Sequence, residues 1–328
     1  MVAGDGLSVA VTGPTGTFGS ALMPLLEEDD RVGRVVGIAR RPFDPGARGW
    51  SKMEYRQGDV RDPDALRAAF EGADVVVHLA FLIVGGNKQT TGAINVEGTL
   101  NAFRAAAEAG ARRFVYASSI AAYGFHRDNP IGIPEDWATR PAEKLFYAQE
   151  KAELEHLLGE AAADHPDVEL YLLRPPIVLG PDAVGAKVQL PQALAWIAGG
   201  LQKGVRRLPA LPALVPDLPV QLIHQDDVAS ALLRCTVGAG PAGAYNIAAD
   251  DVLSLVDLAR EAGLRPVPIP GGPVAAAARA AAKLPLPPTA QWVEALSHPA
   301  IMDTTKAKTE LGWTPQHSAL DALRATLD

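Results

Sequence analysis

One stretch decides the fold of this chain: Leu7-Ser8-Val9-Ala10-Val11-Thr12-Gly13-Pro14-Thr15-Gly16-Thr17-Phe18-Gly19. Its first five residues read as a buried strand, its glycines as a tight turn, and the residues up to about Glu28 as a helix. Glycines at this spacing let backbone N–H groups approach a pyrophosphate, and the helix N-terminus adds a partial positive charge. We therefore expect this turn to bind a dinucleotide through Gly13, Thr15, Gly16, Thr17, Phe18 and Gly19. The alternative is a tight turn without a ligand.

Further apolar runs alternate with Ala-rich helical stretches along the first half of the chain. The predicted strands lie at residues 35–39, 74–79, 113–117 and 168–173, with a weak one near Tyr55. One predicted helix begins at Pro63, and two others cover residues 94–109 and 143–163. Repeated strand–helix–strand units with apolar strands predict a doubly wound parallel sheet, an α/β fold of the Rossmann type with helices on both faces.

The amino-acid composition and the strand pattern change after Arg174-Pro175-Pro176. Residues 175–220 and 264–300 are rich in Pro, Leu and Ala, while residues 220–247 again read as strand, helix and strand. We therefore expect a dinucleotide-binding domain formed by residues 1–174 and about 219–250. A smaller substrate lobe would be formed by residues of about 175–218 and 251–328.

Composition excludes several classes of protein. The chain is 48% hydrophobic and 21% charged, which is typical of a packed globular protein and argues against disorder, collagen and coiled coil. Its 30 Lys+Arg and 38 Asp+Glu give a net charge of −8, which argues against a nucleic-acid partner. The single cysteine, Cys235, excludes a disulfide framework, and no His/Asp/Glu cluster has ligand spacing, so no metal is expected. No signal peptide or membrane-spanning stretch is visible, so we expect a cytoplasmic protein without a membrane partner.

The choice between NAD(H) and NADP(H) depends on the end of the second predicted strand. An acidic residue there would bind the ribose 2′-hydroxyl of NAD, but this chain has Ala39, Arg40 and Arg41. Two guanidinium groups suit a 2′-phosphate, so NADP(H) is preferred and NAD(H) is the alternative. The other interpretation is a solvated basic turn. In the next loop, Asp59 beside Val60 is expected to meet the adenine, unless Asp59 belongs only to the turn.

Three side chains suggest acid–base chemistry. Tyr147 and Lys151 are four residues apart in a predicted helix, so they share one face. A neighbouring ammonium group favours phenolate, so we expect Lys151 to lower the pKa of Tyr147. Ser119 follows a predicted strand, at the edge where open α/β sheets bind ligands. A Tyr/Lys pair is common by chance, and serines often only begin a loop. It is the order of glycine turn, serine and Tyr/Lys pair that favours a catalytic site.

On these motifs the chain resembles an extended short-chain dehydrogenase/reductase of the NAD(P)-dependent epimerase/dehydratase type. The resemblance runs nearly end to end and includes Val77-His78-Leu79-Ala80, Asn95-Val96-Glu97-Gly98-Thr99, Ser118-Ser119-Ile120-Ala121-Ala122-Tyr123-Gly124, Leu173-Arg174-Pro175, Ile223-His224-Gln225-Asp226-Asp227, Tyr245-Asn246-Ile247 and Leu311-Gly312-Trp313-Thr314-Pro315.

The resemblance implies a role for each matching residue. Ser119 would hold the substrate oxygen, Tyr147 would exchange a proton with it, and Lys151 would bind the nicotinamide ribose and tune Tyr147. The cofactor channel would be lined by Leu79, Ala80, Asn95 and Pro175. It also implies a homodimer through the helices at residues 95–108 and 143–163. A packing role is the alternative for Asn95, and His78 is expected to be a buried strand residue.

Departures from the family pattern bear on the substrate. Leu145-Phe146 precedes Tyr147, Ile177 stands where nucleotide-sugar enzymes have Asn, and Ser119-Ile120-Ala121 lacks the acid–base pair of dehydratases. We expect substrate contacts from Phe81, Ser119, Leu145, Phe146 and Ile177, although the apolar ones could equally be core.

The leading interpretation is therefore an NADP(H)-dependent oxidoreductase that transfers a hydride between nicotinamide and a hydroxyl or carbonyl group of a fairly apolar small molecule. The alternative is an epimerase of a sugar or nucleotide-sugar. A non-catalytic dinucleotide sensor is a remote third, because such proteins commonly lose the Tyr/Lys pair that this chain keeps.

Overall fold

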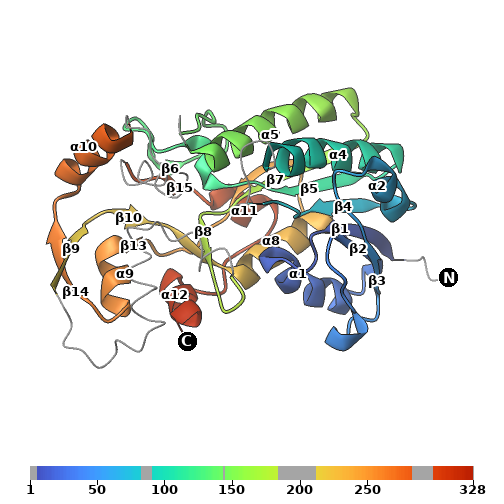
Figure 1. Cartoon of the computed structure of the whole chain (residues 1–328), viewed down its shortest axis with the longest axis horizontal. Helices are drawn as coiled ribbons and strands as arrows, with labels where there is room; N and C mark the ends of the chain where they lie inside the picture. The colour runs from blue at the N-terminus through green and yellow to red at the C-terminus, as the bar shows by residue number, and fades with distance from the viewer. Residues whose placement is uncertain (1–5, 83–90, 143–144, 184–211, 283–297, 328) are drawn as a thin grey trace.

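The computed structural model describes residues 6–82, 91–142, 145–183, 212–282 and 298–327. Its centre is a seven-stranded sheet with the strand order β12-β7-β5-β4-β1-β2-β3, in which every neighbouring pair is parallel (Figure 1). The strands are β1 (Leu7–Thr12), β2 (Val32–Ala39), β3 (Met53–Gln57), β4 (Val75–His78), β5 (Arg113–Ala117), β7 (Glu169–Arg174) and β12 (Gly243–Asn246). This arrangement confirms the predicted doubly wound α/β fold.

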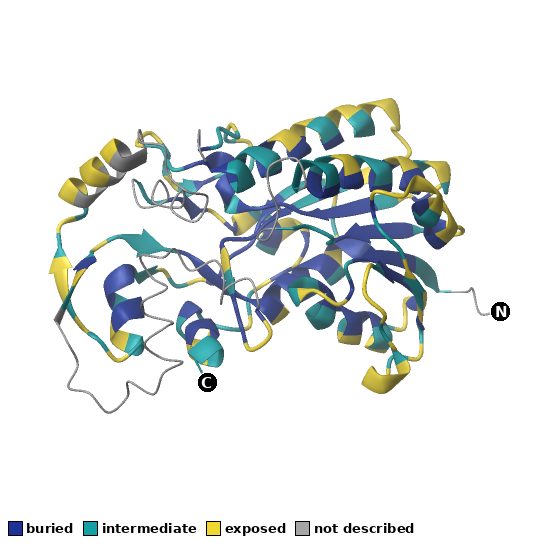
Figure 2. Cartoon of the chain, viewed as in Figure 1, coloured by how far each residue is buried: buried dark blue, intermediate teal, exposed yellow. Residues whose placement is uncertain are grey.

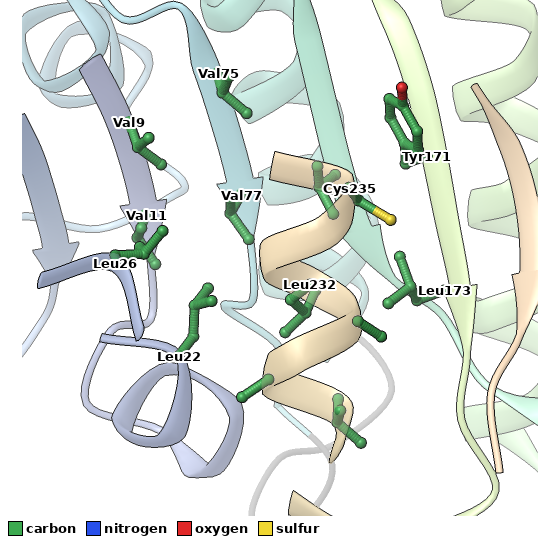
Figure 3. Close-up of a cluster of buried hydrophobic side chains, with 14 of the residues drawn as sticks. Val9, Val11, Leu22, Leu26, Val75, Val77, Tyr171, Leu173, Leu232 and Cys235 are labelled. Carbon is green, nitrogen blue, oxygen red and sulfur yellow. The ribbon is translucent and has the colours of Figure 1, made fainter. Parts of the chain in front are cut away.

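Helices cover both faces of the sheet. One face carries α1 (Thr17–Glu28) and α8 (Gln225–Thr236), and the other carries α2 (Pro63–Phe70), α4 (Gly98–Glu108) and α5 (Phe146–Asp164) (Figure 1). Successive strand residues face opposite sides, so Val9 and Val11 pack in the α1/α8 core while Ala10 packs in the other. Leu22, Leu232 and Cys235 meet the sheet in the first core (Figure 3). The strands are accordingly buried, and the outward faces of the helices are exposed (Figure 2).

Local details differ from the sequence-based bounds. The helix predicted from residue 94 begins as a π-helical turn, η2 (Ala93–Glu97), before α4 continues it. The helix predicted from residue 143 is α5, which begins at Phe146; residues 143 and 144 lie outside the described part. A short 3₁₀ turn, η1 (Gly46–Arg48), precedes β3, and another, η3 (Ile120–Tyr123), follows β5.

A second set of elements lies outside the seven-stranded sheet; β6 (Ile131–Ile133) precedes β7 in the chain, and the others follow it. Its paired strands are β8 (Ile177–Leu179) with β11 (Leu222–His224), β9 (Pro212–Pro216) with β14 (Arg265–Ile269), β10 (Pro219–Val220) with β13 (Leu253–Ser254), and β6 with β15 (Ile301–Met302). Its helices are α9 (Leu255–Glu261), α10 (Gly271–Ala282) and α12 (Ala319–Leu327), whereas α11 (Thr305–Glu310) packs against β12 of the main sheet. Leu179, Leu222, Leu258 and Leu323 belong to a third apolar cluster here. The predicted two-part division stays a prediction, and much of the predicted lobe, residues 184–211 and 283–297, lies outside the described residues.

Within the described segments, no helix combines the length and the apolar character needed to cross a bilayer.

Candidate active site

The glycine turn between β1 and α1 forms one wall of the site. Gly13 has a φ of +69°, which only glycine adopts readily, and its N–H donates to the Ile38 carbonyl at 2.9 Å. A Cβ on Gly13 would lie 3.0 Å from the backbone nitrogen of Ala80. A Cβ on Gly19 would lie 2.6 Å from the carbonyl carbon of Pro14. Both glycines are therefore required by the close approach of neighbouring backbone.

The N-terminus of α1 suits a phosphate. Its N-cap residue is Gly16, and no side chain caps the first turn, so the N–H groups there lack a side-chain acceptor. Thr15 is exposed beside the turn, and the Thr17 hydroxyl donates to the Asp182 carbonyl at 3.4 Å. Phe18 is partly buried against the core, which places it in packing. The turn thus fits the pyrophosphate of a dinucleotide.

The end of β2 lies where the adenosine ribose is expected. Arg40 and Arg41 are both exposed. Asp59 forms an ion pair with Arg61 at 2.7 Å, and the hydrogen bonds from Arg61 hold the pKa of Asp59 below its usual value, with Arg40 adding a smaller effect. Val60 is buried in the core beside α4. Asp59 thus takes part in a local turn with Arg61 and Val60 contributes packing, while their contact with the adenine stays a prediction.

Ser119 and Tyr147 meet at the carboxyl edge of the sheet. Ser119 is the N-cap of η3, where its Oγ accepts from the N–H of Ala121 at 3.2 Å. Tyr147 lies in the first turn of α5, and its phenol is hydrogen-bonded to the side chain of Ser119. Burial raises the pKa of Tyr147 to about 12, and the bond to Ser119 opposes this only in part. The expectation of a lowered pKa is therefore wrong for this structure, because desolvation of the phenolate outweighs every opposing effect.

Lys151 is buried one helical turn further along α5. Its Nζ donates to the Ala117 carbonyl at 2.6 Å and to the Tyr116 hydroxyl at 3.0 Å, and it lies 5.8 Å from the centroid of the Tyr147 ring. Burial lowers the pKa of Lys151 to about 7, although the carboxylates of Glu155 and Glu150 act in the opposite direction. At neutral pH, Lys151 is thus close to its titration midpoint.

Phe81 closes the group formed by Tyr147 and Lys151. Its ring centroid lies 5.8 Å from that of Tyr147, nearly perpendicular to it, and 3.7 Å from Nζ of Lys151. Leu145, by contrast, is buried in a small core cluster, so the alternative of packing applies to it. Phe146 is partly buried, and Ile177 is 36% exposed on β8. Phe81 and Ser119 contact Tyr147 directly, Leu145 belongs to a cluster against which Tyr147 packs, and the substrate role of all five residues stays a prediction.

The predicted channel residues are held by backbone contacts. Asn95 accepts from the N–H of Leu82 at 2.7 Å, and its amide donates to the Leu82 carbonyl at 2.9 Å and to Glu150 at 2.7 Å. Asn95 therefore satisfies backbone groups just after β4, and its place in a cofactor channel stays a prediction. The N–H groups of Leu79 and Ala80 both donate to the Thr12 hydroxyl at 3.1 Å. The Pro175 carbonyl accepts from Ile120 at 2.9 Å.

His78 is a buried structural residue, as expected. Hydrogen bonds join its Nδ1 to Thr12 at 2.9 Å and its Nε2 to Thr99 at 3.0 Å. Burial, with a smaller contribution from Lys151, lowers the pKa of His78 to about 3, so the ring stays neutral. It ties the first strand to α4 beneath the site.

A buried ion pair that is not among the predicted site residues supports the site. Glu155 accepts from Arg174 at 2.5 Å and from the Ser118 hydroxyl at 2.5 Å, and both charged side chains are nearly inaccessible. Arg174 also donates to Tyr123 at 2.5 Å. The signal was available, because Glu155 repeats the four-residue spacing of Tyr147 and Lys151 along one face of α5.

One histidine cluster bears on the expectation of no metal. His224, Asp226 and His317 have possible ligand atoms within 4.8 Å of one another, a proximity that sequence spacing could not reveal. The two rings are stacked, with centroids 4.1 Å apart, and the absence of a metal stays a prediction. Nδ1 of His224 accepts the N–H of Asp226 at 3.2 Å, and Nδ1 of His317 lies 3.2 Å from Asp227. The cluster caps α8 and anchors the segment before α12.

Comparisons with known proteins agree with this architecture. Residues 9–248 match the model of the NAD dependent epimerase/dehydratase family, and the chain belongs to this family. An uncharacterised Mycobacterium tuberculosis protein, Rv0501, is 28% identical over 96% of this chain and 81% of its own. A Caulobacter vibrioides protein named ceramide reductase is 31% identical over 69% of this chain and 59% of its own. The Bordetella bronchiseptica enzyme WbmG, solved with NAD, has the same fold, with a TM-score of 0.72, 20% identity and coverage of 100% and 94% of the two chains.

Proposed function

We propose that this chain is a nicotinamide-dependent enzyme that interconverts a hydroxyl and a carbonyl group, with Tyr147 as the acid and base. The observation that carries the proposal is the hydrogen bond between Tyr147 and Ser119 beside the ammonium group of Lys151. Ser119 follows the end of β5, and Tyr147 and Lys151 lie in the first turns of α5. Both residues of α5 are close to Phe81, in the segment after β4. Ala80 in turn packs against Gly13, which joins this group to the glycine turn.

The proposal gives each residue a part in the reaction. A nicotinamide dinucleotide, when bound, supplies or accepts the hydride. Ser119 donates a hydrogen bond that orients the substrate oxygen beside the phenol. In the direction of reduction, Tyr147 gives its proton to that oxygen as the carbon gains the hydride, and a phenol with a pKa of about 12 is fully protonated and ready for this step at neutral pH. In the direction of oxidation, Tyr147 must first lose its proton, and a charged Lys151 favours the resulting phenolate.

The family match favours epimerisation as the net reaction. A family described as NAD dependent epimerases and dehydratases supports a reaction in which the substrate is oxidised and reduced again within one site, so that no cofactor is consumed. Under this proposal the substrate is a sugar or nucleotide-sugar and the cofactor is NAD. The interpretation as an epimerase thus has more support from the comparisons than the leading interpretation of the sequence.

Net reduction of an apolar molecule by NADPH is the second candidate. It is supported by the exposed pair Arg40 and Arg41, without an acidic residue at the end of β2, and by the aromatic ring of Phe81 against Tyr147. The Caulobacter relative named ceramide reductase is in line with it. The cytoplasmic location and the homodimer through the helices at residues 95–108 and 143–163 stay predictions.

One experiment separates these candidates. The purified protein is incubated with UDP-sugars and, separately, with long-chain ketones and alcohols, each with NAD⁺, NADP⁺ and NADPH. Absorbance at 340 nm reports net redox change, and proton NMR of the sugar reports inversion. Inversion without a change in absorbance supports epimerisation, whereas NADPH consumption with a ketone supports reduction. If Tyr147→Phe performs either reaction as fast as the wild type, the proposed role of Tyr147 is wrong.

A further inference from the structure

Strand β5 supplies two hydrogen-bond acceptors for the ammonium group of Lys151. Two acceptors come from consecutive residues of this strand, the Tyr116 hydroxyl at 3.0 Å and the Ala117 carbonyl at 2.6 Å. The ring of Phe81 covers a third side, with its centroid 3.7 Å from Nζ. An ammonium group has three protons to donate, so two are committed to β5 and the third faces an aromatic surface.

We propose that Tyr116 is a positioning residue, whose hydroxyl holds the ammonium group of Lys151 beside the ring of Tyr147. The proposal rests on the proposed function, because it gives Lys151 the place from which it serves Tyr147. It concerns the hydroxyl of Tyr116 and not its ring, since a phenylalanine would fill the same buried position.

The ring of Tyr116 is itself held in place by the ring of His78 on β4. It is 1% exposed, and it stacks on the ring of His78, with centroids 6.2 Å apart and planes 25° apart. Hydrogen bonds with Thr12 and Thr99 hold the two nitrogens of His78, one ring nitrogen accepting and the other donating. The Tyr116 hydroxyl is thus the end of a rigid stack, which distinguishes it from a flexible partner that merely follows Lys151.

The remaining groups around Lys151 explain why one hydroxyl can matter. On α5, Glu150 and Glu155 favour the charged amine, and Tyr147 is a neutral phenol with a raised pKa. On β4, His78 is neutral. The charge of Glu155 is shared with Arg174 on β7 through their ion pair at 2.5 Å. Desolvation acts against the ammonium form, so the acceptors that β5 places at 2.6 and 3.0 Å from Nζ add direct hydrogen bonds to the support that the two carboxylates give.

The test uses a substitution that removes one oxygen atom. Tyr116→Phe is compared with Tyr171→Phe, a matched control on the adjacent strand β7. Tyr171 packs in the core of the other sheet face and donates to the Gly240 carbonyl at 2.8 Å. The titration of Lys151 is followed in the cofactor-free protein by NMR of ¹³C-labelled lysine, with its ε-carbon resonance assigned from Lys151→Arg.

In Tyr116→Phe, we expect the midpoint of Lys151 to fall by about one pH unit, since the charged amine loses an acceptor. In Tyr171→Phe it should not move. Oxidation needs a charged Lys151, so the pH above which the oxidation rate falls should be lower in Tyr116→Phe by the same amount. An unchanged midpoint in Tyr116→Phe would overturn the proposal, whatever the activity shows. If the midpoint moves while Tyr147→Phe keeps full activity, the positioning role stands and the proposed function falls.

A second measurement does not depend on the stability of Tyr116→Phe. The ¹³Cζ resonance of Tyr116 reports the hydrogen bonding of its oxygen, and it is compared between the wild type and Lys151→Met. A shift of this resonance, with that of Tyr171 unchanged, is the expected result. Identical Tyr116 resonances in the two proteins would show that Lys151 is not its partner.

Discussion

Replacing Gly16 by alanine should separate dinucleotide binding from stability. Gly16 has φ −83° and ψ 177°, an extended conformation that alanine adopts without strain. A Cβ there would have the Gly13 carbonyl oxygen as a neighbour at 3.4 Å, an ordinary contact. The small N-cap preference for glycine and the lower chain entropy of alanine roughly cancel, so the free energy of unfolding should change by less than about 0.5 kcal/mol. The new methyl group, however, occupies the exposed side of the turn where a pyrophosphate must approach. Dinucleotide affinity should therefore fall at least about tenfold, or about 1.4 kcal/mol.

Gly19→Ala is the contrasting variant for this experiment. Its Cβ would lie 2.6 Å from backbone carbon of Pro14, which cannot move aside as a side-chain end could. We expect a loss of about 1–3 kcal/mol of unfolding free energy together with the loss of binding. Urea unfolding measures stability, and titration of nicotinamide fluorescence with NADH and NADPH measures affinity. If Gly16→Ala binds both dinucleotides as tightly as the wild type, the assignment of this turn to a pyrophosphate is refuted.

Three further predictions concern charge. Arg174→Met leaves Glu155 buried without its partner and should lower the free energy of unfolding, measured in urea, by about 3–5 kcal/mol. Much of this loss should be recovered when Glu155 is also replaced by methionine. A loss below about 1 kcal/mol would contradict the buried ion pair. Replacing Arg40 and Arg41 together by alanine should weaken NADP⁺ binding about tenfold and leave NAD⁺ binding unchanged, as measured by calorimetry; equal effects on both would favour the solvated basic turn. The pKa of His78 is about 3 in the fold and 6.5 as the ordinary value, so below pH 6.5 the unfolded chain binds a proton that the folded chain does not, and the free energy of unfolding decreases as the pH decreases. Between pH 7 and pH 5.5 the wild type should lose about 1 kcal/mol more unfolding free energy than His78→Gln. Equal losses would show that His78 is not buried in its neutral form.

The sequence predicts the parts of this fold that depend on local pattern. Apolar runs such as Val9–Val11 and the glycines after them report burial and backbone conformation directly, so the first strand, its turn and its helix were found. The register of Tyr147 and Lys151 follows in the same way from the period of a helix. The π-helical start at Ala93 was not predicted, because a local change in helical period leaves the apolar pattern almost unaltered.

The electrostatics of the site could not be predicted, because they depend on depth and on contacts between distant parts of the chain. The spacing shows that Lys151 follows Tyr147 but not that both are desolvated, which reverses the expected direction of the Tyr147 pKa. Tyr116 reads as one more aromatic residue in a buried strand, and only the packing of α5 on β5 brings its hydroxyl to Lys151. The stacking of His224 on His317 is hidden for the same reason, since their segments meet only in the folded chain.

The proposed reaction depends on Tyr147 as the group that exchanges a proton with the substrate beside the bound dinucleotide. The most direct measurement is the turnover of Tyr147→Phe on the substrate found in the screen, with dinucleotide affinity determined in the same samples. We expect turnover to fall by about 10²–10⁴-fold while the dissociation constant of the dinucleotide changes by less than about threefold. Turnover at the wild-type rate, or a loss of activity fully explained by lost dinucleotide binding, would contradict it.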